Sequence, residues 1–148
     1  MKRYKQPVSV LVVIYTAALD VLLLERADHP GYWQSVTGSC ETGETLAETA
    51  IREVREETGL DTGLYTLCDW QAQSTYEIYP EWRYRYHPDI THNTEHTFSL
   101  QLPHPVAVQL EPREHLNLLW LTWQDAAEKV FSPSNRAAIF ALKERESS

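Results

Sequence analysis

The sequence predicts one mixed α/β domain in which a sheet packs between helices. Its length, residues 1–148, suits a single domain, and a composition of 43% apolar and 23% charged residues is that of a globular chain. Strand-like apolar runs outnumber helical segments and stand in mixed order with them. Many strands with few helices in such an order favour a sheet covered by helices.

The predicted strands are short apolar or alternating runs. The first two, Val8–Tyr15 and Val21–Leu24, follow each other across a short polar break and predict a hairpin of buried strands. The other strand signals fall at Trp33–Thr37, Leu64–Ile78, Thr94–Leu102 and Leu118–Leu121.

The start of the chain also has features of a secretion signal, because a basic opening precedes an apolar run. Pro7 and Ser9 keep the apolar part short, so we favour the buried hairpin. No run approaches the roughly twenty residues that a membrane-spanning helix needs. Cys40 and Cys68 fit no metal or CxxC spacing, and we expect two reduced thiols in a soluble, cytoplasmic protein.

The first helix is expected over residues 45–58. Thr45 and Glu48 have the spacing of a capping box, and Gly59 supplies the stop.

The second helix is expected over Pro133–Glu144. Ser132 is suited to cap it, and proline is favoured at the first helical position. A shorter helical stretch, Trp123–Val130, follows the last strand.

The charge of the chain disfavours nucleic acid as a partner. Thirteen Lys and Arg against twenty-one Asp and Glu give a formal charge of −8. An acidic protein does not gather phosphate backbones by bulk attraction. An anionic substrate would therefore need local cations or bound metal ions.

Carboxylates on the first helix are candidate metal ligands. Glu53 and Glu57 are four residues apart and repel each other, and neither has Lys or Arg three or four residues away. Glu56 lies on the same arc, and Arg52 is four residues from both Glu56 and Glu48. From spacing alone, a solvated acidic face and a site for Mg²⁺, with Mn²⁺ as the alternative ion, are equally good interpretations.

The stretch from Gly38 to Leu60 resembles the Nudix box at every specified position: Gly, five residues, Glu, seven residues, Arg-Glu, an aliphatic, any residue, Glu-Glu, any residue, Gly, an aliphatic. The resemblance implies an α/β/α sandwich around a mixed sheet, with the box on a loop–helix–loop. It implies hydrolysis of a nucleoside diphosphate linked to another moiety, by attack of water at phosphorus. The residues it assigns to the metal are Glu53, Glu56, Glu57 and the carbonyl of Gly38, and those it assigns to bracing the loop are Glu44 and Arg52.

The flanks of the box resemble one branch of this family. The segments are WQSVTGS at 33–39, PVSVLVVIY at 7–15, NTEHTFSLQLP at 93–103, EHLNLLWL at 114–121 and SPSNRAAI at 132–139. This branch converts dihydroneopterin triphosphate to the monophosphate and pyrophosphate in folate synthesis, and dATP is a secondary substrate. A sanitiser of oxidised purine triphosphates and a non-catalytic nucleotide sensor remain alternatives, although sensors commonly lose box carboxylates.

Flanking side chains are expected to choose the substrate. Candidate phosphate ligands are Arg26, which closes a strand, and Lys5. Candidate walls for a flat ring are Tyr32, Trp33 and Tyr76, each of which also suits the core. Further candidate contacts are Thr37 and the loop and first helical turn, Ser132, Pro133, Ser134 and Asn135.

A carboxylate outside the box is expected to complete the metal site or to act as general base. The eligible residues are Glu77, Glu95, Glu111 and Glu114, and we prefer Glu114 because a loop places it before a strand. The basic, aromatic segment 82–87 is expected at an interface or at the mouth of the pocket. The histidines, His92, His96 and His115, share no ligand spacing and are expected to be ordinary. The sequence leaves open a monomer or a homodimer.

Overall fold

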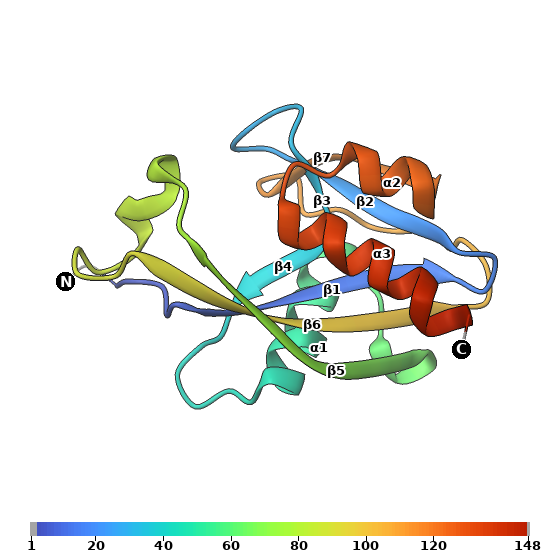
Figure 1. The fold of residues 1–148 in the computed structure, drawn as a ribbon, viewed down its shortest axis with the longest axis horizontal. Helices are drawn as coiled ribbons and strands as arrows, with labels where there is room; N and C mark the ends of the chain where they lie inside the picture. The colour runs from blue at the N-terminus through green and yellow to red at the C-terminus, as the bar shows by residue number, and fades with distance from the viewer. Residues whose placement is uncertain (1–2, 148) are drawn as a thin grey trace.

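The computed structural model describes residues 3–147 and contains a mixed seven-stranded sheet. Its main path runs β3-β2-β1-β6-β5, with β4 paired to β1 and β7 paired to β2 (Figure 1). The strands are β1 (Val8–Thr16), β2 (Asp20–Arg26), β3 (Trp33–Gln34), β4 (Val36–Ser39), β5 (Thr66–Glu77), β6 (His92–Leu102) and β7 (His115–Thr122). The helices are α1 (Leu46–Thr58), α2 (Trp123–Lys129) and α3 (Pro133–Ser147), with 3₁₀ turns η1 (Thr62–Leu64) and η2 (Pro80–Arg85).

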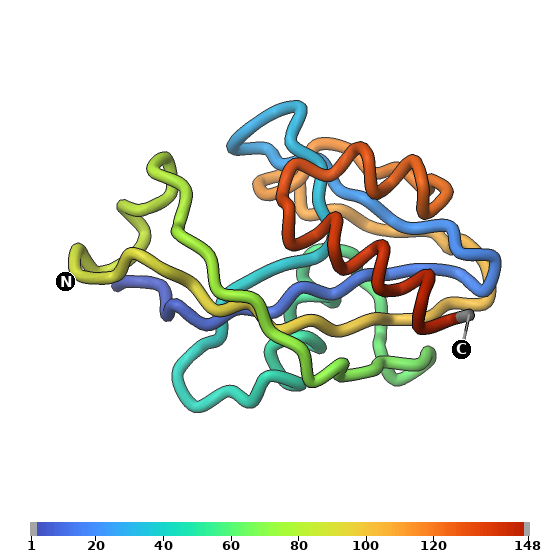
Figure 2. Tube along the Cα trace, viewed as in Figure 1, coloured from blue at the N-terminus to red at the C-terminus, as the bar shows by residue number. Residues whose placement is uncertain are grey.

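The central strand β1 is buried on both faces and divides the core into two layers. Val10, Val12 and Ile14 pack with α1 on one face, whereas Leu11 and Val13 pack with α2 and α3 on the other. Figure 2 shows α3 crossing the face of β1 and β6 opposite to α1. The expected sheet between helices, an α/β/α sandwich, is confirmed.

Strand β1 changes partner along its length. It runs parallel to β6 throughout, whereas its other edge pairs with β4 over residues 9–12 and reaches β2 at Tyr15, opposite Val21. The predicted hairpin of the first two strands is confirmed as antiparallel, but β2 spends most of its length against β7. Strand β4 therefore takes the place of β2 beside the first part of β1.

Two predicted boundaries differ from the structure. The expected strand at 33–37 is two strands, because the backbone N–H of Ser35 donates to the side chain of Asn135 at 2.8 Å. Helix α3 continues to Ser147, beyond the predicted end. The capping box of Thr45 and Glu48 is present, and Gly59 ends α1 with a φ of 74°.

Within residues 3–147, none of the helices combines the length and the hydropathy needed to cross a membrane.

Candidate active site

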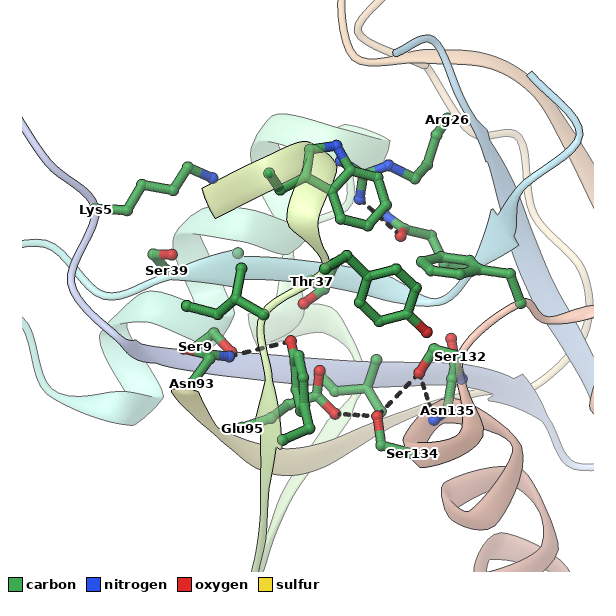
Figure 3. A pocket seen from close by; sticks show the side chains of 18 of the residues that line it. Lys5, Ser9, Arg26, Thr37, Ser39, Asn93, Glu95, Ser132, Ser134 and Asn135 are labelled. Carbon is green, nitrogen blue, oxygen red and sulfur yellow. Dashed lines mark hydrogen bonds between the residues drawn. The ribbon is translucent and has the colours of Figure 1, made fainter. Parts of the chain in front are cut away.

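Residues from the box and from its flanks line one cavity of about 770 Å³. Its walls come from β1, β4, α1, β5, β6, the segment around η2 and the start of α3 (Figure 3). Eight of the predicted substrate contacts line it: Lys5, Arg26, Thr37, Tyr76, Ser132, Pro133, Ser134 and Asn135. Segments that are distant in sequence therefore meet at one site.

Two buried carboxylates form the acidic centre of this cavity. Helix α1 places Glu53 and Glu57 one turn apart, with 8% and 1% of their surface exposed. Among the described residues, neither oxygen of Glu57 has a hydrogen-bond partner. Burial, and after it the neighbouring Glu53, raise the pKa of Glu57 well above its ordinary value. A Cβ on Gly38 would overlap the carboxylate of Glu53, so the β4 backbone passes against it.

This pair fits a divalent cation that is only partly enclosed by protein. Buried carboxylates that lack hydrogen bonds are stabilised by a counter-cation. In the described part of the chain, no three His, Cys, Asp or Glu side chains are grouped so that they could enclose a metal ion. Mg²⁺ commonly takes one or two carboxylates and completes its shell with water and substrate phosphate, so an open site of this kind suits it.

Of the three box carboxylates assigned to the metal, Glu56 is the one that does not line the cavity. Its Oε2 accepts a hydrogen bond from Nη1 of Arg52 at 3.2 Å, and its side chain is 51% exposed. The predicted pairing of Arg52 with Glu56 is confirmed. The pairing of Arg52 with Glu48 is not found, because the carboxylate of Glu48 caps the helix at the N–H of Thr45.

Arg52 ties the loop of the box to its helix. Its Nε and Nη2 donate to the two carboxylate oxygens of Glu44 at 2.6 and 3.0 Å, and Nη2 also donates to the carbonyl of Ser39 at 3.0 Å. Arg52 Nη1 donates to Glu53 at 2.7 Å. The hydrogen bonds from Arg52 hold the pKa of Glu44 at about 2. The contacts are those of a brace, and they orient Glu53 as well.

Glu114 and His115 approach the acidic centre from the loop before β7. Glu114 lines the cavity, and its charge acts on both Glu57 and Lys5. His115 was expected to be ordinary, but it is 4% exposed and its Nε2 lies 3.5 Å from Oε1 of Glu57. Burial, and after it the charge of Arg26, lower the pKa of His115 to about 4, so its ring is neutral at pH 7. No spacing in the sequence indicates this contact.

The other eligible carboxylates divide between pocket and surface. Glu95 lies on the cavity wall and is almost fully buried. Glu111 faces Arg113, whose Nε donates to it at 3.0 Å, and Glu77 is exposed; neither lines the cavity.

Four cationic side chains line the cavity: Lys5, Arg26, Arg85 and Arg113. Burial, and after it the charge of Arg85, lower the pKa of Lys5. Asp28 accepts two hydrogen bonds from Arg26, both at 2.7 Å, and one from Nη2 of Arg85 at 3.0 Å. It also accepts from Nε1 of Trp82 at 3.0 Å, so one carboxylate fastens the η2 segment to β2.

Aromatic side chains form the wall opposite the sheet. Tyr79, Trp82 and Phe131 line the cavity, and the guanidinium of Arg26 lies 4.3 Å from the centre of the Trp82 ring. The segment 82–87 thus contributes to the cavity, whereas the sequence offered either an interface or the mouth of the pocket for it. Of the predicted ring walls, Tyr76 lines the cavity and Tyr32 supports it by stacking on Phe131 at 4.4 Å.

Trp33 does not line the cavity; it packs against the core layer of α2 and α3.

The end of the cavity near α3 is polar and hydrogen-bonded. Ser132 and Ser134 are linked at 2.9 Å, and the hydroxyl of Ser134 donates to Glu95 at 2.9 Å (Figure 3). Asn135 uses both ends of its amide on Ser35, at 2.8 and 3.0 Å. Thr37 donates its hydroxyl to the carbonyl of Val10. Asn135 and Thr37 therefore shape the cavity, whereas Glu95 and Ser134 offer polar atoms to it.

The sequence of this chain is similar to those of known proteins. The NUDIX domain matches residues 5–142. The chain belongs to the Nudix family. It is 48% identical to the dihydroneopterin triphosphate diphosphatase of Escherichia coli K12, over 93% of each chain, and 43% identical to that of Haemophilus influenzae, over 94% of this chain and 89% of the other.

A solved structure extends the likeness to three dimensions. The E. coli dihydroneopterin triphosphate pyrophosphohydrolase superposes with a TM-score of 0.88, covering 93% of this chain and 95% of that one. The mixed sheet flanked by helices is therefore the predicted family fold.

Proposed function

We propose that this protein is a metal-dependent pyrophosphohydrolase that converts dihydroneopterin triphosphate to dihydroneopterin monophosphate and pyrophosphate. One observation carries the proposal: a single cavity joins Glu53, Glu57 and four cationic side chains to a hydrogen-bonding end that has one carboxylate, Glu95, beside aromatic rings. Anionic phosphates suit the first end and a flat heterocycle suits the second. The identity to diphosphatases of this name, over nearly the whole chain, supports the same substrate.

The cation would be Mg²⁺, with Mn²⁺ as an alternative, held by Glu53 and Glu57 and by the carbonyl of Gly38. Glu56 would join them once its carboxylate leaves Arg52. When bound, such an ion would neutralise charge on the phosphates and lower the pKa of a water molecule. Its charge would offset the repulsion between the two buried carboxylates.

The residues of the chain supply positioning and charge. Lys5, Arg26 and Arg85 would bind the triphosphate and stabilise charge that develops on it. Glu114 is exposed in its loop and reaches the cavity, so it would accept the proton of the attacking water or add a metal ligand. The oxygen of that water would bond to the α or the β phosphorus, and the bond from that phosphorus to the oxygen that bridges the two would break. The bridging oxygen would keep the electron pair, and the monophosphate and pyrophosphate would be released.

Three further features belong to this proposal. The protein would act in the cytoplasm as one domain, with Cys40 and Cys68 as free thiols. It would be a monomer or a homodimer. It would accept dATP as a secondary substrate, because a purine is also a flat ring with donors and acceptors on its edge.

The test measures pyrophosphate and phosphate release with Mg²⁺ from dihydroneopterin triphosphate, dATP and 8-oxo-dGTP. We expect pyrophosphate from all substrates that turn over, the highest kcat/KM for the pterin, and no turnover in EDTA. A higher kcat/KM for 8-oxo-dGTP would indicate a nucleotide sanitiser. Binding without turnover of any substrate would indicate a sensor.

A further inference from the structure

The wall of the cavity beside α3 carries a group of polar side chains from two paired strands. Asn93 and Glu95 are two residues apart on β6, and their partners on β5 are Tyr76 and Ser74. Directly paired residues of antiparallel strands lie on the same face, so all of them face the cavity that they line.

Glu95 is the one carboxylate in this group. It is 5% exposed, and its Oε1 accepts the hydrogen bond from Ser134. Among the described residues, no hydrogen bond reaches Oε2 of Glu95 and no Lys, Arg or His forms an ion pair with it. Burial raises the pKa of Glu95. A buried carboxylate that lacks a cation and has one oxygen without a hydrogen-bond donor lowers the stability of the protein. A ligand with N–H donors would supply the missing hydrogen bonds.

Two neighbours of Glu95, Asn93 and Tyr76, also have polar atoms with which a ring could form hydrogen bonds. The amide nitrogen of Asn93 donates to Ser9 at 2.7 Å and to the hydroxyl of Tyr76 at 3.1 Å. The Oδ1 atom of Asn93 is buried and has no partner in the described chain. Because the Tyr76 oxygen accepts from Asn93, its own proton is available to an acceptor. This end of the cavity therefore complements an uncharged, polar edge rather than phosphate.

We infer that Glu95, held in place by Ser134, is the residue that selects the ring. Its carboxylate would accept two hydrogen bonds from the adjacent amino and ring N–H groups of a 2-amino-4-oxopyrimidine, the half of a pterin that lies farthest from the triphosphate side chain. Adenine presents an amino group beside a ring nitrogen that is an acceptor, so it satisfies only one oxygen of Glu95. This inference rests on the proposed function and adds the group that separates pterin from adenine.

Glu95→Gln tests the inference, because the amide keeps the size of the side chain and still accepts from Ser134, yet presents one donor and one acceptor. That pair matches adenine and opposes a ring N–H. We expect kcat/KM for dihydroneopterin triphosphate to fall roughly 100-fold, as for the loss of a charged hydrogen bond with a donor left unpaired. For dATP we expect a change of less than about threefold or a gain.

Two further variants make the result specific. Ser134→Ala removes the hydroxyl that orients Glu95 and is expected to lower the pterin-to-dATP ratio roughly fivefold to tenfold. Glu77→Gln changes an exposed carboxylate on the neighbouring strand, outside the cavity, and is the matched control with an unchanged ratio. Circular dichroism and melting temperature verify that each variant is folded.

Equal losses for pterin and dATP in Glu95→Gln would overturn the inference and indicate a role in the chemistry or the fold. So would an unchanged ratio in both Glu95→Gln and Ser134→Ala. The proposed function is judged separately, by the wild-type preference for the pterin. If the wild type instead prefers purines, dGTP, which has adjacent amino and ring N–H donors, replaces the pterin in the same comparison with dATP.

Discussion

The two ends of the cavity are built in opposite ways. The box end is highly charged, and its contacts are local: Arg52 bonds to Glu44, eight residues away, and to Glu53 beside it. The α3 end has one carboxylate and is held by contacts between remote segments: Glu95 and Ser134 are 39 residues apart, and Ser35 and Asn135 are 100 apart. The carboxylates of the box are thus oriented within one short stretch, whereas ring recognition depends on contacts between remote segments.

The largest expected effect comes from removing charge at the box end. Glu57→Gln is expected to lower kcat by about 10³-fold or more, because a neutral amide cannot hold a divalent cation. The metal-free variant is also expected to be more stable than the wild type at pH values above the raised pKa of Glu57, where the wild type carries a buried, ionised carboxylate without hydrogen bonds and the variant does not.

Steady-state kinetics and urea unfolding in EDTA check both effects, with Glu128→Gln on the surface of α2 as the control. The direction in which stability changes with pH follows from the pKa of Glu57. Because the folded pKa of Glu57 is raised, the wild type loses stability as pH rises through that pKa, and Glu57→Gln removes this loss. Normal turnover by Glu57→Gln would contradict the assignment of the metal site to the box end of the cavity.

Gly38→Ala is expected to have the next largest effect. The added Cβ would displace the carboxylate of Glu53, and a misplaced ligand is expected to cost roughly 100-fold in kcat/KM. Because the change lies at the box end, pterin and dATP should lose equally, unlike in Glu95→Gln. Gly63→Ala, whose Cβ meets only the side chain of Asp61, is the control. A ring-selective loss in Gly38→Ala would contradict the division into two ends.

Asp28→Asn tests the connection between the ends. The neutral side chain would weaken the hydrogen bonds that hold Arg26, Arg85 and Trp82 together. We expect KM to rise about threefold to tenfold, with kcat within about twofold, because substrate binding and the wall of the cavity are affected but the carboxylates are not. Faster proteolysis at Arg83 or Arg85 would report the loosened segment. An unchanged KM would show that Asp28 has no part in binding.

Glu44→Gln is expected to have the smallest effect, mainly on stability. The pKa of Glu44 is about 2, below its ordinary value of 4.5. A lowered folded pKa gives stability that is complete above the unfolded pKa and is lost as pH falls toward about 2. The variant should be about 1 kcal/mol less stable at pH 7, a modest value because the network is partly exposed. The difference from wild type should shrink between pH 5 and pH 2.5 in urea unfolding; a constant difference would contradict the ion pair.

The same contrast explains what the sequence could predict. The capping box and Gly59 involve residues close in sequence, so spacing predicted them, and the resemblance to the Nudix box implied the brace of Arg52. His115 against Glu57 and the aromatic wall of Tyr79 and Phe131 depend on how distant segments pack, and no local pattern indicates them.

One strand boundary also could not be predicted from the sequence. Ser35 interrupts a predicted strand because its N–H bonds to Asn135, which only the packing of α3 on the sheet brings near. The pattern of apolar residues could not reveal this.

The brace of Arg52 has a consequence for how such proteins diversify. Its hydrogen bonds to Ser39, Glu44, Glu53 and Glu56 all stay within the box itself. The arrangement of the box carboxylates can therefore be inherited as one short stretch of sequence. Mutations in β5, β6 and α3 are free to explore new substrates without dismantling the chemistry, and a lineage can change what it hydrolyses while keeping how it does so.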